Sequence, residues 1–99
     1  MTPVTFEGVI IGMKAADIVG QSMPHLLLRL RNDAGAVGTV DVGQRLVFPQ
    51  GTFDANPRGH ISATGQLGAL DGHLVLFAQQ IHIGTTTIPI MRAPPAPPH

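Results

Sequence analysis

A short segment of the chain places basic side chains at alternate positions, with His25, Arg29 and Arg31 separated by apolar residues. Alternate side chains of an extended strand share one face, so this segment predicts a basic strand face. Lys14 lies upstream and adds a further cation. Guanidinium and ammonium groups bind phosphate oxygens, so these four residues are candidate nucleic-acid contacts.

Binding of single-stranded nucleic acid also uses aromatic rings, because each stacked base contributes roughly 1–3 kcal/mol. Phe53 and Phe77 are the candidate stacking rings, and the segments 25–31 and 37–42 contain no aromatic residue. The alternative is that Arg29 and Arg31 lie on an exposed strand face, where they are solvated or one of them pairs with Asp41 across a hairpin. Such a pair contributes a few tenths of a kcal/mol up to about 1 kcal/mol.

Histidine is the residue type that raises the question of a metal site. The chain has 5 histidines, at positions 25, 60, 73, 82 and 99, without the close spacing of paired ligands. His60, His73 and Asp71 form the alternative set, at one end of the fold, for zinc or copper. Polar residues at strand ends explain these positions without a metal, and we expect no metal site and no cofactor.

Catalytic patterns are scarce in the sequence. Ser22 and Ser62 are the serines, and neither lies in a Gly-x-Ser-x-Gly elbow. Glu7 is the single glutamate, and the aspartates fall mainly in turn sequences, where hydrogen bonding to the backbone explains them. We therefore expect a protein that is not an enzyme.

The overall composition limits the function further. The 99 residues fit one small domain, and the formal net charge of zero argues against a strongly electrostatic binder of nucleic acid or anionic membrane. With no cysteine, disulfides and thiolate chemistry are excluded. No segment resembles a signal peptide or a membrane span, so we expect a soluble protein without membrane insertion, and an exported origin stays open.

β-type alternation recurs between glycine and proline residues, and this predicts an all-β chain. The expected strands are Val4–Met13, His25–Arg31, Val37–Val42, His60–Leu67, His73–Ile83 and Thr86–Met91. The residues between them predict a loop over 14–23 and a long connector over 43–59. Residues 1–92 would form one barrel domain, and the proline-rich residues 93–99 an extended, mobile tail.

Two strands carry special features. Gly8 and Gly12 in the first strand predict a strong bend that turns a barrel corner. In the fifth strand, the buried set begins with Leu74, Leu76 and Ala78 and resumes on the opposite parity at Ile81. A β-bulge near Gln79 and Gln80 reconciles the two registers.

A bent first strand, a hairpin, a connector and a second hairpin predict a five- to six-stranded, OB-fold-like Greek-key barrel. Four segments lie at corresponding places in this strand order: Gly8–Ile10, Gln21–Leu28, Ile61–Gly65 and Leu74–Ile81. In these segments the chain resembles the bacterial single-stranded-DNA-binding and primosomal replication protein B group. The resemblance implies nucleic-acid binding through basic and aromatic residues, and most of the corresponding outer positions here are neither.

A second resemblance is to small bacterial OB-fold modules, which are often exported. It is carried by Asn32–Gly35, Val40–Gly43 and His73–Leu76. This resemblance implies the same fold without a specific ligand.

Val75 and Phe77 form an apolar strip on the outer parity of the fifth strand and are the candidate interface residues. Either the strip contacts a protein partner or a second copy, or the connector covers it within the monomer. The low charged content of 12% favours a covered surface or a homo-oligomer. We expect a non-catalytic OB-fold binding module acting through protein contacts or a small oligomeric ligand. The alternative is an accessory single-stranded-DNA-binding protein.

Overall fold

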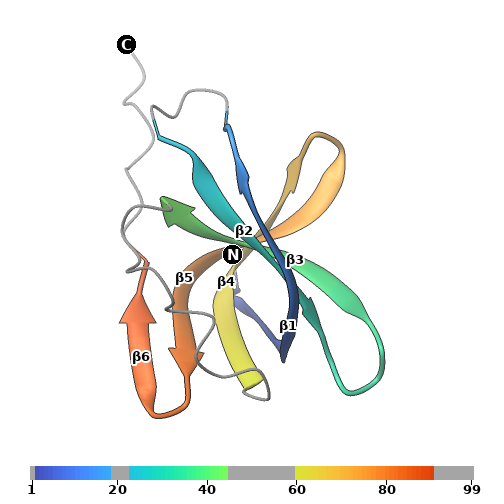
Figure 1. The fold of residues 1–99 in the computed structure, drawn as a ribbon, viewed down its shortest axis with the longest axis vertical. Helices are drawn as coiled ribbons and strands as arrows, with labels where there is room; N and C mark the ends of the chain where they lie inside the picture. Colours follow the sequence, from blue (N-terminus) through green and yellow to red (C-terminus); the bar gives the residue numbers. More distant parts are fainter. Residues whose placement is uncertain (1, 19–22, 45–59, 91–99) are drawn as a thin grey trace.

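The computed structural model describes residues 2–18, 23–44 and 60–90 (Figure 1). These residues form a single antiparallel-rich sheet, so the all-β prediction is confirmed. The strands are β1 (Val4–Ala16), β2 (His25–Arg31), β3 (Val37–Gln44), β4 (His60–Leu70), β5 (His73–Ile83) and β6 (Thr86–Pro89). The predicted tail and most of the predicted connector lie outside the described residues.

The sheet curls until β3 meets β5, which gives it a barrel-like shape. Its strand order is β3-β2-β1-β4-β5-β6, and a short parallel pairing of β3 with β5 brings the ends together. That pairing joins Val40 to Leu76 and Asp41 to Phe77. In Figure 1 the β2–β3 and β4–β5 hairpins extend away from the region where the strands cross. This separation of the hairpins shapes the surface described below.

The first strand bends and serves both halves of the sheet, as its glycines predict. β1 pairs with β4 over Val4–Val9 and with β2 over Val9–Ala16, and its register shifts between Ile10 and Gly12. Gly8 is buried against the carbonyl group of Arg31, where a Cβ atom would overlap that oxygen. The strand continues to Ala16, so the prediction of a loop beginning at Lys14 is wrong. The reason is that the backbone of β1 remains paired with β2 after the bulge.

The bulge predicted in the fifth strand is confirmed. Thr64 pairs with Gln80 and Gly65 pairs with Ala78, which leaves Gln79 as the extra residue. Because one additional residue reverses the parity of the side chains, Ala78 and Ile81 both face the core. Ile90 donates its backbone N–H to the Gln79 carbonyl oxygen at 2.8 Å, so the bulge also anchors the chain that follows β6.

The core lies between the inner faces of the curled sheet. Its buried members are Leu26, Leu28, Leu30, Val40, Val42, Ile61, Ala63, Leu76, Ala78, Ile81 and Ile90. Leu74, which was expected in the buried set, is exposed, as is Leu67, because both lie where the β4–β5 hairpin extends past the core. Within the described residues, no helix is long and apolar enough to span a bilayer.

Candidate binding groove

A groove of about 640 Å³ runs along the outer face of the sheet. The end of β1, the middle of β2 and the start of β3 form one side, and the β4–β5 hairpin forms the other. The described residues that line it are Gly12, Met13, Lys14, Ala16, Asp17, Leu27, Arg29, Val37, Gly38, Thr39, Leu70, Asp71, His73, Leu74 and Val75.

Two tight turns hold the walls of this groove in place. At the tip of β4–β5, Asp71 and Gly72 have φ values of 52° and 79°, the left-handed conformations of a two-residue hairpin turn. The β2–β3 turn is closed by Asn32, whose N–H donates to the Ala36 carbonyl oxygen and whose side-chain oxygen accepts from the Ala36 N–H, both at 2.9 Å. Both turns match the Asn-Asp-Ala-Gly and Asp-Gly signals in the sequence.

The groove is apolar at its floor and along its rim. Leu27 and Val75 lie buried at the floor, although both belong to the outer parity of their strands. Met13, Val37 and Leu74 stand at the rim with exposed fractions of 46%, 45% and 69%. An apolar floor with exposed apolar edges is typical of a surface that binds another molecule.

Charges of both signs surround the apolar surface. Lys14 and Arg29 supply two cations, and Asp17 and Asp71 supply two carboxylates. Neither cation forms an ion pair with another residue in the described part of the chain. Among the described residues, the groove therefore carries two cations and two carboxylates, and its cations have no ion-pair partner there.

The structure brings together only some of the predicted nucleic-acid contacts. Lys14 and Arg29 line the same groove, whereas Arg31 is exposed and does not line it. Phe77 is half-buried, and its ring packs over Gly68, where a Cβ atom would lie 2.7 Å from the ring. Phe53 lies outside the described residues. Of the described residues that line the groove, none is a phenylalanine, and His73 supplies the single ring.

Val75 and Phe77 were the predicted interface residues, with two open alternatives for their environment. Val75 is buried at the groove floor and Phe77 is half-buried, so in this structure neither forms an exposed strip. The exposed apolar surface of β5 is instead at Leu74, which the alternation of the strand assigned to the core. The signal that identifies Leu74 is its position next to the Asp71–Gly72 turn, beyond the last residues that the core covers.

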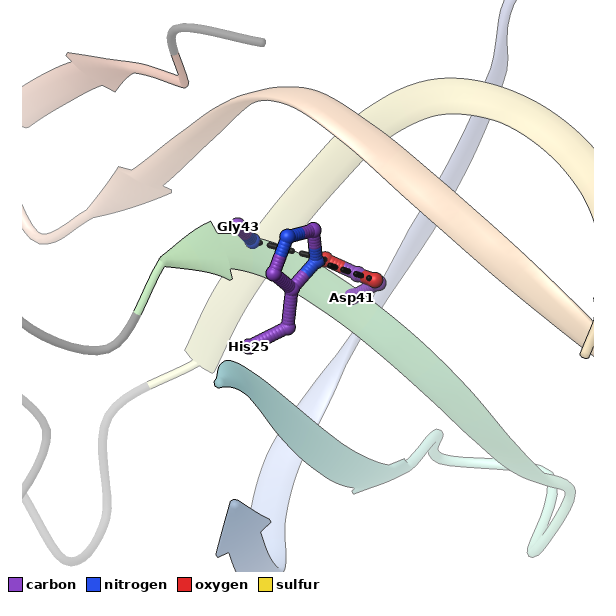
Figure 2. Close-up of polar contacts among 3 residues, drawn as sticks. All are labelled: His25, Asp41 and Gly43. Carbon is purple, nitrogen blue, oxygen red and sulfur yellow. Dashed lines mark hydrogen bonds and ion pairs between the residues drawn. The ribbon is translucent and has the colours of Figure 1, made fainter. Parts of the chain in front are cut away.

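The pairing predicted between Asp41 and Arg29 or Arg31 across the hairpin is wrong. Arg29 lies opposite Thr39 and Arg31 opposite Val37, while Asp41 lies opposite Leu27. Asp41 is fully buried and contacts His25 (Figure 2).

His25 is therefore not exposed on the basic face that the sequence predicted. Its Nδ1 atom lies 2.9 Å and 3.1 Å from the two carboxylate oxygens of Asp41. The Gly43 N–H donates to Asp41 Oδ1 at 2.7 Å (Figure 2). These hydrogen bonds link the start of β2 to the end of β3 and provide the polar partners that a buried carboxylate needs.

A second polar hollow lies on the β1–β4–β5 face. It is lined by Glu7, His60, Ser62, His82 and Gly84. His60 Nδ1 lies 4.0 Å from Glu7 Oε1, and His82 Nδ1 lies 2.6 Å from the Thr87 hydroxyl oxygen.

The sequence suggests His60, His73 and Asp71 as an alternative metal-binding set. His60 lies in the second hollow, while His73 and Asp71 line the groove, so the alternative set is not assembled. In the described ranges, no three His, Asp or Glu side chains form a group that holds a metal ion.

The groove thus combines an apolar floor, exposed apolar edges, two cations and two carboxylates. Comparison of the chain with protein-family models, with curated proteins and with solved structures gave no match.

Proposed function

We propose that this chain is a non-catalytic binding module with an OB-fold barrel, and that its groove binds a protein partner. Two topological features support the OB-fold assignment. β1 is shared between β2 and β4, and the β3–β5 pairing joins the sheet ends in a five-stranded circuit to which β6 is added. In OB-folds, the face of the second and third strands and the adjacent loops bind the ligand.

The observation that carries the proposal is the exposed apolar rim. Met13, Val37 and Leu74 come from three different strands and meet around one groove. Their exposure costs hydrophobic free energy in the isolated chain, and a partner that covers them recovers it at about 25 cal/mol per Å². Protein surfaces supply such apolar contact together with polar groups at the rim.

The charges of the groove also suit a polypeptide. Lys14 and Arg29 would bind carboxylates or carbonyl oxygens, and Asp17 and Asp71 would bind cationic or N–H groups. A polypeptide offers all of these groups along one chain, whereas a nucleic acid offers a single sign of charge.

An accessory role in binding single-stranded DNA is the second candidate. The presence of Lys14 and Arg29 together in the groove favours it, because both cations could contact phosphates. Stacking would have to come from Phe77 or Phe53. A titration of fluorescent oligothymidylate into the full chain at low and moderate salt tests this candidate. Steeply salt-dependent binding that weakens in Lys14→Ala and Arg29→Ala supports it, and lack of binding at low salt excludes it.

The protein-binding proposal is tested with a phage-displayed library of random 12-residue peptides, selected on the full chain. Leu74→Asp removes apolar surface from the rim, and Ile11→Asp is the matched control, because Ile11 is exposed to 45% and does not line the groove. Synthetic peptides from the selection should bind the wild type and Ile11→Asp equally and bind Leu74→Asp about tenfold or more weakly.

Two results would overturn the proposal. The first is a selection that enriches no peptide over the starting library. The second is equal affinity of the selected peptides for both variants. Sedimentation velocity of the free chain addresses self-association: a dimer that Leu74→Asp dissociates would make a second copy the occupant in place of a separate partner.

A further inference from the structure

The groove contains an open seam between two strands. β3 and β5 run parallel and pair at Val40–Leu76 and Asp41–Phe77. Toward the beginnings of both strands this pairing stops, although β3 starts at Val37 and β5 at His73. In the described residues the two strand beginnings diverge and form opposite walls of the groove.

The backbone of Val37 faces this seam. Asn32 and Ala36 form a hydrogen-bonded pair, with the Asn32 N–H donating to the Ala36 carbonyl oxygen. Antiparallel pairs alternate between hydrogen-bonded and non-hydrogen-bonded types. Arg31 and Val37 are the next pair, so the N–H and C=O of Val37 point away from β2. The same alternation directs Asp41 toward β5, in agreement with the observed Asp41–Phe77 pairing.

The backbone of Leu74 faces the seam from the other side. Leu70 and His73 flank the two-residue Asp71–Gly72 turn and are the hydrogen-bonded pair of that hairpin. Ala69 and Leu74 are then a non-hydrogen-bonded pair, so the N–H and C=O of Leu74 point away from β4. Each wall therefore presents backbone donors and acceptors directly beside an exposed apolar side chain.

We propose that the partner of this groove is an extended protein segment that adds as a β-strand along the open edge of β3 at Val37. This inference rests on the proposed function and specifies how the partner is held. Strand addition obtains its affinity from backbone hydrogen bonds and its specificity from alternate side chains. Here alternate apolar side chains of the segment contact Leu27 and Val75, and an acidic residue among them pairs with Arg29.

The orientation of the backbone groups gives the experiment its variants. Val37→Pro removes the N–H that faces the seam, and proline is tolerated at the first residue of a strand. Val37→Ala shortens the side chain and retains the N–H. The peptides selected on the full chain should bind Val37→Pro about three- to tenfold more weakly than Val37→Ala, the effect of one hydrogen bond.

Amide hydrogen exchange supplies an independent measurement on the wild-type chain. Saturation with a selected peptide should slow exchange at the Val37 amide about tenfold or more, with the Leu74 amide protected as well if the strand spans the seam. The Gly38 amide is the internal control, because the alternation directs it toward β2 in the free protein. Its exchange should change much less.

The outcomes separate this inference from the proposed function. If selected peptides bind, depend on Leu74 and leave both the Val37 amide and the Val37→Pro affinity unchanged, strand addition is wrong and groove binding stands. If no peptide is enriched, both fail. Slower exchange at Val37 together with weaker binding by Val37→Pro supports strand addition.

Discussion

The imidazole of His25 and the carboxylate of Asp41 form a buried pair, with Nδ1 of His25 lying 2.9 Å from Oδ2 of Asp41. Asp41 is also one of the two β3 residues that pair with β5. The pair therefore lies beside the β3–β5 pairing, which closes the sheet. Loss of either partner leaves a buried polar group without its hydrogen bonds, which costs more free energy than the intact pair contributes.

Asp41→Ala should lower the free energy of unfolding by about 3 kcal/mol, because it removes the acceptor of both His25 and the Gly43 N–H. Asp41→Asn keeps an oxygen for Gly43 and should cost less. Urea unfolding of the three proteins at neutral pH measures both effects. A cost below about 1 kcal/mol for Asp41→Ala would show that the His25–Asp41 pair does not stabilise the β3–β5 pairing.

Gly65→Ala tests the close contact of β4 with β5. A Cβ atom at this position would overlap the carbonyl oxygen of Phe77, a backbone atom that cannot rotate away. We expect a loss of roughly 3 kcal/mol in unfolding free energy. Gly12→Ala is the control, since its Cβ would lie 3.9 Å from the Arg29 Cβ. Equal stability of the two variants would contradict this account of Gly65.

Deletion of Gln79 tests the bulge. Without the extra residue, Ala78 and Ile81 are two positions apart, so a regular strand places both on the core face and keeps the pairing of Gln80 with Thr64. The deletion variant should therefore fold with a cooperative transition by circular dichroism and lose about 0.5–1.5 kcal/mol, the contribution of the Ile90–Gln79 backbone hydrogen bond. Gln79→Ala keeps the chain length, and because Gln79 is exposed it should change stability by no more than about 0.5 kcal/mol. A deletion variant without a cooperative transition would contradict this account, because it would show that the strand needs the bulge for more than its register.

The strands and the bulge could be predicted from the sequence because local patterns determine them. The parity change at Gln79 is visible in the chain, as are the glycines that bend β1. The environment of Asp41 depends instead on register: a turn closed by Asn32 and Ala36 places Leu27, and not an arginine, opposite Asp41. Alternation alone assigns a residue to a face and does not say what covers that face.

The groove shows the same limit of alternation, which does not predict what covers a strand face. Leu27 and Val75 belong to the outer parity of their strands, and they are buried because the wall of the groove comes from a distant hairpin. Lys14 and Arg29 were predicted individually as cations. That both line one groove with Leu74 follows only from the three-dimensional path of β1, which continues past the bulge to Ala16.

Leu74 and Leu76 provide the final prediction, because they share one parity of β5 and differ in exposure. Leu76 is 4% exposed and belongs to the core, whereas Leu74 is 69% exposed at the groove rim. Leu76→Ala should cost about 2–5 kcal/mol of unfolding free energy, from lost burial and the resulting cavity. Leu74→Ala should change it by about 0.5 kcal/mol or less.

Urea unfolding of the two alanine variants, followed by circular dichroism, makes the comparison. If Leu74→Ala destabilised the chain as much as Leu76→Ala, Leu74 would be a core residue in solution and the rim of the groove would be closed. The expected difference instead leaves the Leu74 side chain without a stabilising role in the isolated chain. The proposed contact with a partner would give this exposed apolar side chain a role.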